Sequence, residues 1–259
     1  MLQGGKDLNP SWHFLLSFIL IALVLFINRL KGFGLGKEIL IASLRASVQL
    51  IILSSVILII FSYKGSSLTL LALGIMIVAA AHTSKKRAMG LKRSFWISLV
   101  AIALGSLSIL FLMVFMGLLK MNARILLPLG GMVIGNAMVI NSLALERLRA
   151  EIKGNVVTID AALALGATPK IAVAELIKRS IRASLIPRLD SLTTLGLVWI
   201  PGLMAGMILG GSDPLLAAQY QIIIMFMILS AATITVTIST EFISREFFTS
   251  SYQLKEEFR

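Results

Sequence analysis

The sequence predicts an all-α, polytopic membrane protein with about seven transmembrane helices. Three observations support this fold class: the mean hydropathy is +0.95, 58% of the residues are hydrophobic, and only 14% are charged. A soluble domain is about half apolar and a quarter charged, so one buried core could not absorb the excess of apolar residues. We expect lipid to cover the remainder, because long apolar segments aggregate in water.

Seven stretches approach the roughly 20 apolar residues with which a helix crosses the hydrocarbon layer. They are residues 11–27, 39–61, 68–81, 95–118, 125–145, 191–211 and 217–240. The first stretch has no basic lead-in beyond Lys6, and no small-residue cleavage pattern follows it. We therefore interpret it as a retained span and not as a signal peptide.

The basic residues predict how the chain is oriented. If alternate loops are assigned to the cytoplasm, starting after the first span, that side holds 19 of the 24 Lys and Arg residues. This bias follows the positive-inside rule and predicts an external N-terminus and a cytoplasmic C-terminus in the inner or plasma membrane. It also accounts for the net charge of +12 without a nucleic-acid partner. The absence of cysteine excludes disulfides and thiolate metal sites.

We expect one permease domain over residues 1–259. Five spans lie in residues 1–145, cytoplasmic helices in 146–190, two spans in 191–241 and a cytoplasmic tail in 242–259. The loop 146–190 is long enough to have its own structure. It is predicted to form two helices: the first stops at Gly166, and the second starts with Thr168 as N-cap and Pro169 at its first position and continues to Pro187.

The first of these helices carries a recognisable motif. Asp160, two alanines and Gly166, four residues after the second alanine, resemble the cytoplasmic motif of ATP-binding-cassette permeases. In that family, a short helix at this motif docks into a groove on the ATPase subunit. Pro187 lies further beyond Gly166 than the usual spacing gives. By this resemblance, the residues that couple to the ATPase are Asp160, Ala161, Ala162, Gly166, Ala167, Thr168 and Pro169.

A wider resemblance covers the second half of the chain. The segments that carry it are 135–138 (Gly-Asn-Ala-Met), 165–169, 180–187, 201–206, 213–214 and 220–222. They are similar to the FetB-type permeases, a family that includes bacterial iron exporters and plant aluminium-tolerance proteins. The resemblance implies a homodimer with two copies of a separate ATPase subunit, which would use ATP and Mg. It also implies export of iron or another metal ion, with a nucleotide sugar or other organic solute as the alternative cargo.

The chain lacks the Gly-x-x-x-x-Gly-Lys-Ser/Thr phosphate loop, so we expect a transport subunit that binds no cofactor and is not itself an enzyme. A stand-alone ion-coupled transporter is a second hypothesis. Such a protein normally needs a carboxylate or histidine relay in the membrane, whereas Arg45 is the one Asp, Glu, Lys or Arg residue inside the predicted spans. A membrane scaffold without transport activity would leave the loop 146–190 unexplained.

Polar and thioether side chains near the predicted spans are candidates for the translocation path. They are Arg45, Gln49, Asn136, Met138, Asn141, Asp190, Met204 and Met207. Each has a packing alternative: arginine snorkels to the interface, asparagine and glutamine bond to neighbouring helices, and methionine fills gaps. Asp190 could receive a cation or pair with Arg182 or Arg188. No spacing predicts a preformed metal site.

Small residues and prolines predict close packing and hinges. Gly131 and Gly135 form a small-x-x-x-small pair, and Gly202, Gly206 and Gly210 form two successive pairs along the sixth span. Pro201 is expected to open the hydrogen-bond ladder within that span, and Pro187 to mark a hinge before it.

Overall fold

The computed structural model describes residues 10–62, 67–88, 91 and 93–258, with the backbone alone for residues 10–15. The described residues form nine α-helices and a short 3-10 helix, so the all-α prediction is confirmed. The chain divides into two compact units, Met1–Lys64 and Gly65–Arg259.

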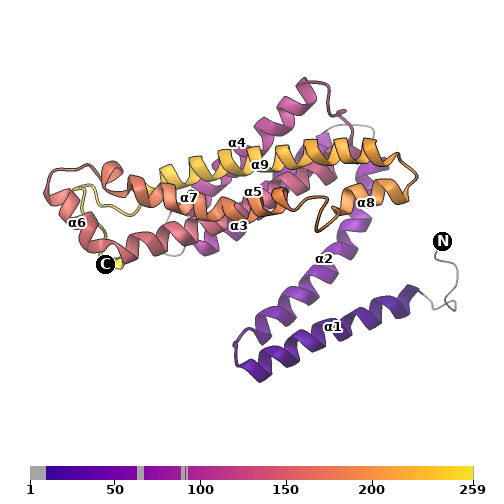
Figure 1. The fold of residues 1–259 in the computed structure, drawn as a ribbon, viewed down its shortest axis with the longest axis horizontal. Helices are drawn as coiled ribbons and strands as arrows, with labels where there is room; N and C mark the ends of the chain where they lie inside the picture. The colour runs from indigo at the N-terminus through magenta and orange to yellow at the C-terminus, as the bar shows by residue number, and fades with distance from the viewer. Residues whose placement is uncertain (1–9, 63–66, 89–90, 92, 259) are drawn as a thin grey trace. The chain divides into compact units, whose positions relative to one another are not determined.

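The first unit contains helices α1 (Pro10–Lys31) and α2 (Gly36–Ser62), joined by a short turn. Gly34 in this turn has a φ of +74°, a backbone conformation that suits glycine. Asn28 is buried against the turn, and its side-chain oxygen accepts a hydrogen bond of 3.1 Å from the backbone N–H of Leu35. The two helices cover the predicted first and second spans (Figure 1).

Burial differs between the helices that are long and apolar enough to cross a membrane. The described residues contain five such helices: α2, α3 (Ser67–Arg87), α4 (Ser94–Phe115), α5 (Ala123–Gly154) and α9 (Pro214–Arg245). In the most apolar window of α2 only 6% of the residues are buried, against 50% in α9. Apolar helices exposed to this degree require lipid or another protein chain around them, so the protein is a multi-pass membrane protein.

The core of the second unit is a bundle of α3, α4, α5 and α9, which approach closely at glycines. A Cβ atom added to Gly105 of α4 would lie 2.7 Å from the backbone oxygen of Ala231 on α9 and would clash with the hydroxyl of Thr235. A Cβ added to Gly130 of α5 would clash with the side chain of Leu73 on α3. At both positions the absence of a side chain allows the helices to touch.

Helices α6 (Val156–Ala164) and α7 (Pro169–Thr193) follow α5. Gly166 between them has a φ of +90°, and Thr168 occupies the N-cap position of α7, as predicted. The prediction that the second helix ends at Pro187 is wrong, because α7 continues through this proline to Thr193. Ile181 and Leu185 of α7 pack against buried residues of α5 and α9, and this packing supports the helix across the residue that would otherwise break it.

The predicted sixth span, residues 191–211, is not one helix. Residues 194–201 leave the helical conformation, and the eight-residue helix α8 (Gly202–Leu209) begins after them. Within the break, Gly196 has a φ of +77° and its backbone N–H donates to the oxygen of Trp199 at 3.0 Å. Pro201 is therefore the N-cap of α8 and does not kink a continuous span; a proline fits before a helix better than within it.

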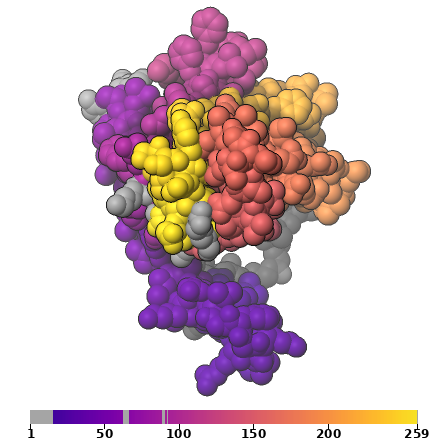
Figure 2. Space-filling model, turned by 90° about the vertical axis from the view of Figure 1, so that its left-hand side faces the viewer, coloured from indigo at the N-terminus to yellow at the C-terminus, as the bar shows by residue number. Residues whose placement is uncertain are grey.

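The end of the second unit at α6 has a core of its own. Buried residues of α5, α6, α7 and α9, of the connection between α3 and α4 and of the residues after α9 form one cluster: Ala88, Leu91, Leu145, Leu148, Ile152, Ile159, Val173, Leu176, Ile177, Ile243, Phe247, Phe248, Leu254 and Phe258. The rings of Phe247 and Phe258 meet edge to face with centroids 4.6 Å apart. The C-terminal residues, drawn in yellow, thus fold back beside α6 and α7 (Figure 2).

Candidate functional site

The turn between α6 and α7, residues 165–168, borders an open cleft of about 690 Å³. Its lining residues come from α6, from this α6–α7 turn and from the C-terminal segment: Asp160, Leu163, Ala164, Gly166, Ala167, Thr168, Ser251, Tyr252 and Gln253. The C-terminal segment is itself a tight turn, in which the backbone N–H of Thr249 donates to the oxygen of Gln253 at 2.8 Å. Two segments far apart in the sequence thus form one surface.

Apolar side chains are exposed on and around the α6–α7 turn. The exposed fraction is 90% for Leu165, 83% for Val157 and 67% for Ile171. These residues lie at the end of the unit where α3, α5 and α9 finish with basic residues, and α6 is drawn at that end in Figure 1. Apolar side chains exposed beyond the membrane-crossing part of a helix bundle are typical of a surface that binds another protein.

The turn is held rigidly although its tip is exposed. Ile159 of α6 and Val173 of α7 are each only 1% exposed and pack into the core at this end of the unit. The ammonium group of Lys170 forms an ion pair of 2.8 Å with the carboxylate of Glu241 on α9. The turn is therefore joined to α5 and α9 through packed side chains.

The residues predicted to couple to an ATPase all lie on this surface or beside it. Asp160, Ala161 and Ala162 belong to α6, with Ala161 exposed and Ala162 half-buried. Gly166, Ala167 and Thr168 form the turn, and Pro169 begins α7. Their position is consistent with the prediction, while the contact with an ATPase stays a prediction.

Asn141 is the centre of a buried polar cluster in the bundle. It is fully buried on α5, and its side-chain nitrogen donates to the hydroxyl of Ser98 on α4 at 3.2 Å. Its side-chain oxygen accepts a hydrogen bond from the hydroxyl of Ser239 on α9. Since Asn141 joins three helices and is closed to solvent in the described residues, the geometry favours the packing alternative for this candidate.

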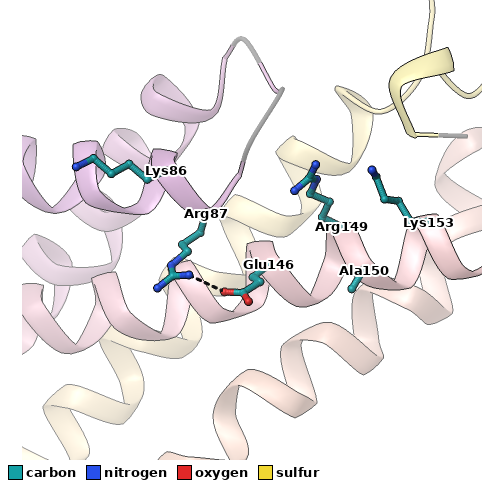
Figure 3. A pocket seen from close by; sticks show the side chains of 6 residues that line it. All are labelled: Lys86, Arg87, Glu146, Arg149, Ala150 and Lys153. Atoms are coloured by element: carbon teal, nitrogen blue, oxygen red, sulfur yellow. Dashed lines mark ion pairs between the residues drawn. The ribbon is translucent and has the colours of Figure 1, made fainter. Parts of the chain in front are cut away.

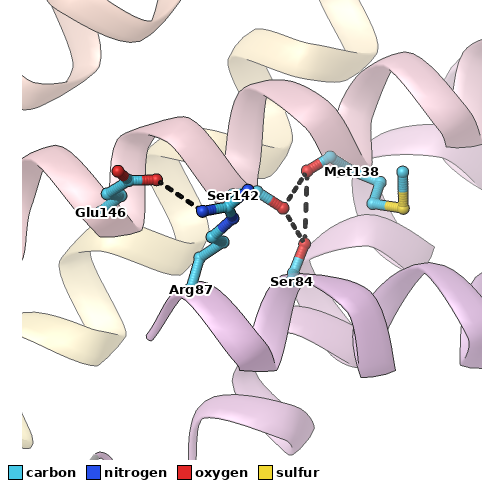
Figure 4. A network of polar contacts seen from close by, with 5 residues as sticks. All are labelled: Ser84, Arg87, Met138, Ser142 and Glu146. Carbon is cyan, nitrogen blue, oxygen red and sulfur yellow. Dashed lines mark hydrogen bonds and ion pairs between the residues drawn. The ribbon is translucent and has the colours of Figure 1, made fainter. Parts of the chain in front are cut away.

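A second polar cluster joins α3 to α5 at the same level of α5, because Ser142 directly follows Asn141. The hydroxyl oxygens of Ser84 and Ser142 lie 3.0 Å apart, and both groups also donate to the backbone oxygen of Met138 (Figure 4). The ion pair between Arg87 and Glu146 follows at 3.6 Å, nearer the helix ends. Met138 takes part in this cluster through its backbone oxygen, while its side chain is half-buried.

Asn136 has a different environment from Asn141. Its side-chain nitrogen donates to the backbone oxygen of Met132 at 2.7 Å, and its side-chain oxygen accepts a hydrogen bond from Arg188 of α7. The Arg188 guanidinium is half-buried, and its Nε is buried without a hydrogen-bond partner among the described residues. We call this pair of side chains the Arg188 site.

The Arg188 site lies at the level of the middle of the predicted fifth span, residues 125–145. Helix α7 packs alongside α5, and Arg188 is 18 residues, about 27 Å, from Lys170 near the start of α7. Asn136 is likewise 18 residues from Gly154 at the end of α5. A helix that ends at Pro187 would leave Arg188 in the loop, so the sequence did not indicate this site.

The other predicted path residues are spread over three places. Met204 and Met207 are half-buried on α8, and Asp190 is exposed near the end of α7. In the described residues, Asp190 pairs with neither Arg182 nor Arg188. Arg45 and Gln49 lie one turn apart on α2 in the first unit, and both are exposed.

The predicted packing glycines differ in what surrounds them. A Cβ added to Gly131 would lie 3.2 Å from the methyl carbon of Met76, so this glycine does pack against α3. Gly135, Gly202 and Gly206 have no such neighbour within 4 Å, and Gly210 meets only backbone oxygens of α8. Their packing role stays a prediction for a partner outside the described residues.

The described residues contain no group of three or more His, Asp or Glu side chains that could hold a metal ion. Two structural features were not predicted from the sequence. Gly105 lies at the closest contact of α4 with α9, and the apolar residues of the segment 247–258 build the core beside α6. Phe247, Phe248, Leu254 and Phe258 are apolar residues within an otherwise polar segment, and this is the signal that could have identified its core.

Comparisons of the sequence with known proteins identify the family of this chain. The model of one family, described as "Uncharacterised protein family (UPF0014)", matches residues 11–248. The "Probable iron export permease protein FetB" of Escherichia coli (strain K12) is 38% identical over 92% of this chain and 92% of its own length. No solved structure matches the chain.

Two further relatives extend the range of organisms. The protein "ALUMINUM SENSITIVE 3" of Arabidopsis thaliana is 34% identical over 92% of this chain and 88% of its own length. The "UPF0014 membrane protein YjkA" of Bacillus subtilis (strain 168) is 35% identical over 93% of this chain and 96% of its own length. The resemblance to FetB-type permeases is thus confirmed, and the chain belongs to the UPF0014 family of membrane proteins.

Proposed function

We propose that this chain is the permease subunit of an ATP-binding-cassette transporter and that a separate ATPase subunit docks on the α6–α7 turn. The observation that carries this proposal is the exposure of Leu165 on the α6–α7 turn and of Val157 on α6, on a segment anchored in a buried core. An exposed apolar turn that is packed against a buried core suits a surface that receives force from another protein. The relative from Escherichia coli, which is named a permease, supports the same conclusion.

The turn is connected to the helices that would move during transport. A displacement of the α6–α7 turn would act on α9 through the core that Val173 and Ile177 of α7 share with Ile243 of α9. It acts on the Arg188 site through α7, which is continuous from Pro169 to Thr193. The ATPase would bind ATP and Mg, two permeases would pair with two ATPases, and the turn and the C-terminus would lie in the cytoplasm. Alternating access then follows from movement of α7 and α8 against the bundle.

Iron or another metal ion is the first candidate for the cargo, exported from the cytoplasm. This choice rests on the name of the relative from Escherichia coli. The side chains available for transient coordination are the carboxamide of Asn136 and the thioethers of Met204 and Met207. Oxygen and sulfur donors of this kind hold a passing ion more weakly than a site of several carboxylates or imidazoles.

An anionic organic solute, such as a nucleotide sugar, is the second candidate, and one observation favours it. The positive guanidinium of Arg188 lies at the level of the middle of the predicted fifth span and has an unsatisfied Nε–H. A cation at this level repels a metal ion and attracts a phosphate group. With the complex in liposomes, stimulation of ATP hydrolysis by Fe²⁺ supports the first cargo, and stimulation by a nucleotide sugar supports the second.

Docking is tested by co-purification of the tagged chain with a cassette ATPase expressed in the same cells. We expect Leu165→Glu to reduce recovery of the ATPase at least about tenfold, because it places a carboxylate in an apolar contact that excludes water. Leu165→Met is the matched control, since it keeps the apolar surface and should retain the complex. Equal recovery with Leu165→Glu, or no complex with the unaltered chain, contradicts the proposal.

A further inference from the structure

A second cleft, of about 340 Å³, opens between the ends of α3 and α5. Its lining residues are Lys86, Arg87, Glu146, Arg149, Ala150 and Lys153 (Figure 3). Lys86 and Arg87 end α3, whereas the other four come from the part of α5 beyond the predicted fifth span. The cleft is separate from the α6–α7 turn and from the Arg188 site.

The cleft has a strongly positive charge. Four basic side chains and one acidic side chain line it, which gives a formal charge of +3 among the described residues. Glu146 pairs with Arg87 at 3.6 Å, but more than half of each side chain is exposed, so this pair is weak and can exchange. Basic residues in the last turn of a helix stabilise that helix end, and this alone could explain their presence. It does not explain why basic residues from two different helices line the same cleft.

The backbone of α5 leaves room for a ligand between these charges. Ala150 follows Glu146 by four residues, so the two lie on the same face, and the short Ala150 side chain leaves this face open. Arg149 and Lys153, also four residues apart, stand one turn from each other beside it (Figure 3). The oxygen atoms of a phosphate group can accept hydrogen bonds from basic side chains such as these.

The cleft lies where lipid headgroups are expected. Leu71 and Ile75 of α3 are each 61% exposed, and Lys86 follows Ile75 by 11 residues, close to three helical turns. The outward apolar stripe of α3 therefore leads to Lys86. On α5, the cleft begins at Glu146, directly after the predicted span 125–145.

We propose that this cleft binds the phosphate group of an anionic phospholipid, whose acyl chains run along the apolar stripe of α3. Lys86 of α3 and Lys153 of α5 attract the phosphate through their positive charges. Arg87 gives up its ion pair with Glu146 and binds the phosphate instead. Basic pockets at the cytoplasmic ends of membrane helices are suited to such headgroups. The proposal goes beyond transport, because it needs neither the ATPase nor a cargo. It assigns to α3 and α5 a lipid site that fixes their ends.

The test measures lipid binding to the purified chain by native mass spectrometry, with phosphatidylglycerol, phosphatidylcholine and inorganic phosphate as separate probes. We expect phosphatidylglycerol to bind more tightly than the other two. The double substitution Lys86→Gln and Lys153→Gln should weaken this binding about 25-fold, because each basic residue at an anionic surface contributes about fivefold in affinity.

The matched control carries Lys120→Gln and Lys178→Gln, which remove the same charge at exposed residues of the second unit that do not line the cleft, and should leave the affinity unchanged. Equal losses in the two double variants would overturn the site, because net charge alone would then explain binding. Equal affinity for phosphatidylcholine and phosphatidylglycerol would also overturn it. If inorganic phosphate bound as tightly as the lipid and competed with it, the ligand would be a soluble phosphate and the lipid proposal would be wrong.

Discussion

Asn136 and Asn141 lie five residues apart on α5 but have contrasting environments. At about 100° per residue, five residues turn the helix by about 140°, so the two side chains point to different neighbours. Asn141 points into the bundle and joins α4 and α9 through two serine hydroxyls. Asn136 points to α7 and contacts an arginine that retains an unsatisfied donor. The first arrangement is closed and structural, and the second can still take a ligand.

The same contrast extends to the surrounding helices. In the bundle of α3, α4, α5 and α9, glycines such as Gly105 and Gly130 have neighbours closer than a side chain would allow. In α8, a Cβ atom added to Gly202 or Gly206 would meet no other atom within 4 Å. The bundle is therefore a packed frame, whereas the segment from the end of α7 through α8 offers surfaces that the described residues do not cover. Movement and binding are expected in the second region.

The largest expected effect concerns the closest contact in the bundle. Gly105→Ala should lower the free energy of unfolding by about 1–3 kcal/mol, because the new methyl group overlaps the Thr235 side chain and the backbone of Ala231. Thermal unfolding in detergent measures this loss. Gly202→Ala is the matched control and should leave the midpoint nearly unchanged. A similar loss in both variants would show that the two regions are packed equally well.

The next effect compares the two asparagines directly. Asn141→Leu should cost about 1–2 kcal/mol, because the hydroxyls of Ser98 and Ser239 lose their partner inside the bundle. Asn136→Leu should cost less, because this side chain is half-buried and Arg188 keeps access to other acceptors. Unfolding midpoints and transport are measured for both. Normal stability with impaired transport in Asn141→Leu would place Asn141 in the path and contradict the contrast.

The sequence predicts the bundle of α3, α4, α5 and α9 better than the segment from the end of α7 through α8, for physical reasons. Long apolar stretches are sufficient to locate α2, α4 and α9, and Gly166 with Pro169 correctly marks the start of α7. The break at residues 194–201 could not be predicted from hydropathy, because Leu195, Leu197, Val198 and Ile200 make this segment as apolar as a helix. The Arg188 site was missed for a related reason: Pro187 signals a helix end, but packing against α5 overrides that signal.

The candidate sites were predictable to different degrees. The α6–α7 turn follows from a local motif of small residues, which can be recognised along the chain. The contribution of Tyr252 to the same cleft, like the pairing of Arg188 with Asn136, depends on contacts between residues far apart in the sequence. Such contacts are set by how helices pack, and no local pattern encodes them.

The smallest expected effect on stability belongs to Arg188, and this substitution tests the open region most directly. Arg188→Gln keeps a donor for Asn136 and should change the free energy of unfolding by less than about 1 kcal/mol. It removes the positive charge, so stimulation of ATP hydrolysis by an anionic cargo should fall about tenfold or more, while stimulation by a metal ion should not fall. Arg188→Lys is the control: it retains the charge and should retain most of the response to an anion. If Arg188→Gln instead destabilised the protein as much as Asn141→Leu, Arg188 would be a packing residue like Asn141, and the two faces of α5 would serve the same structural purpose.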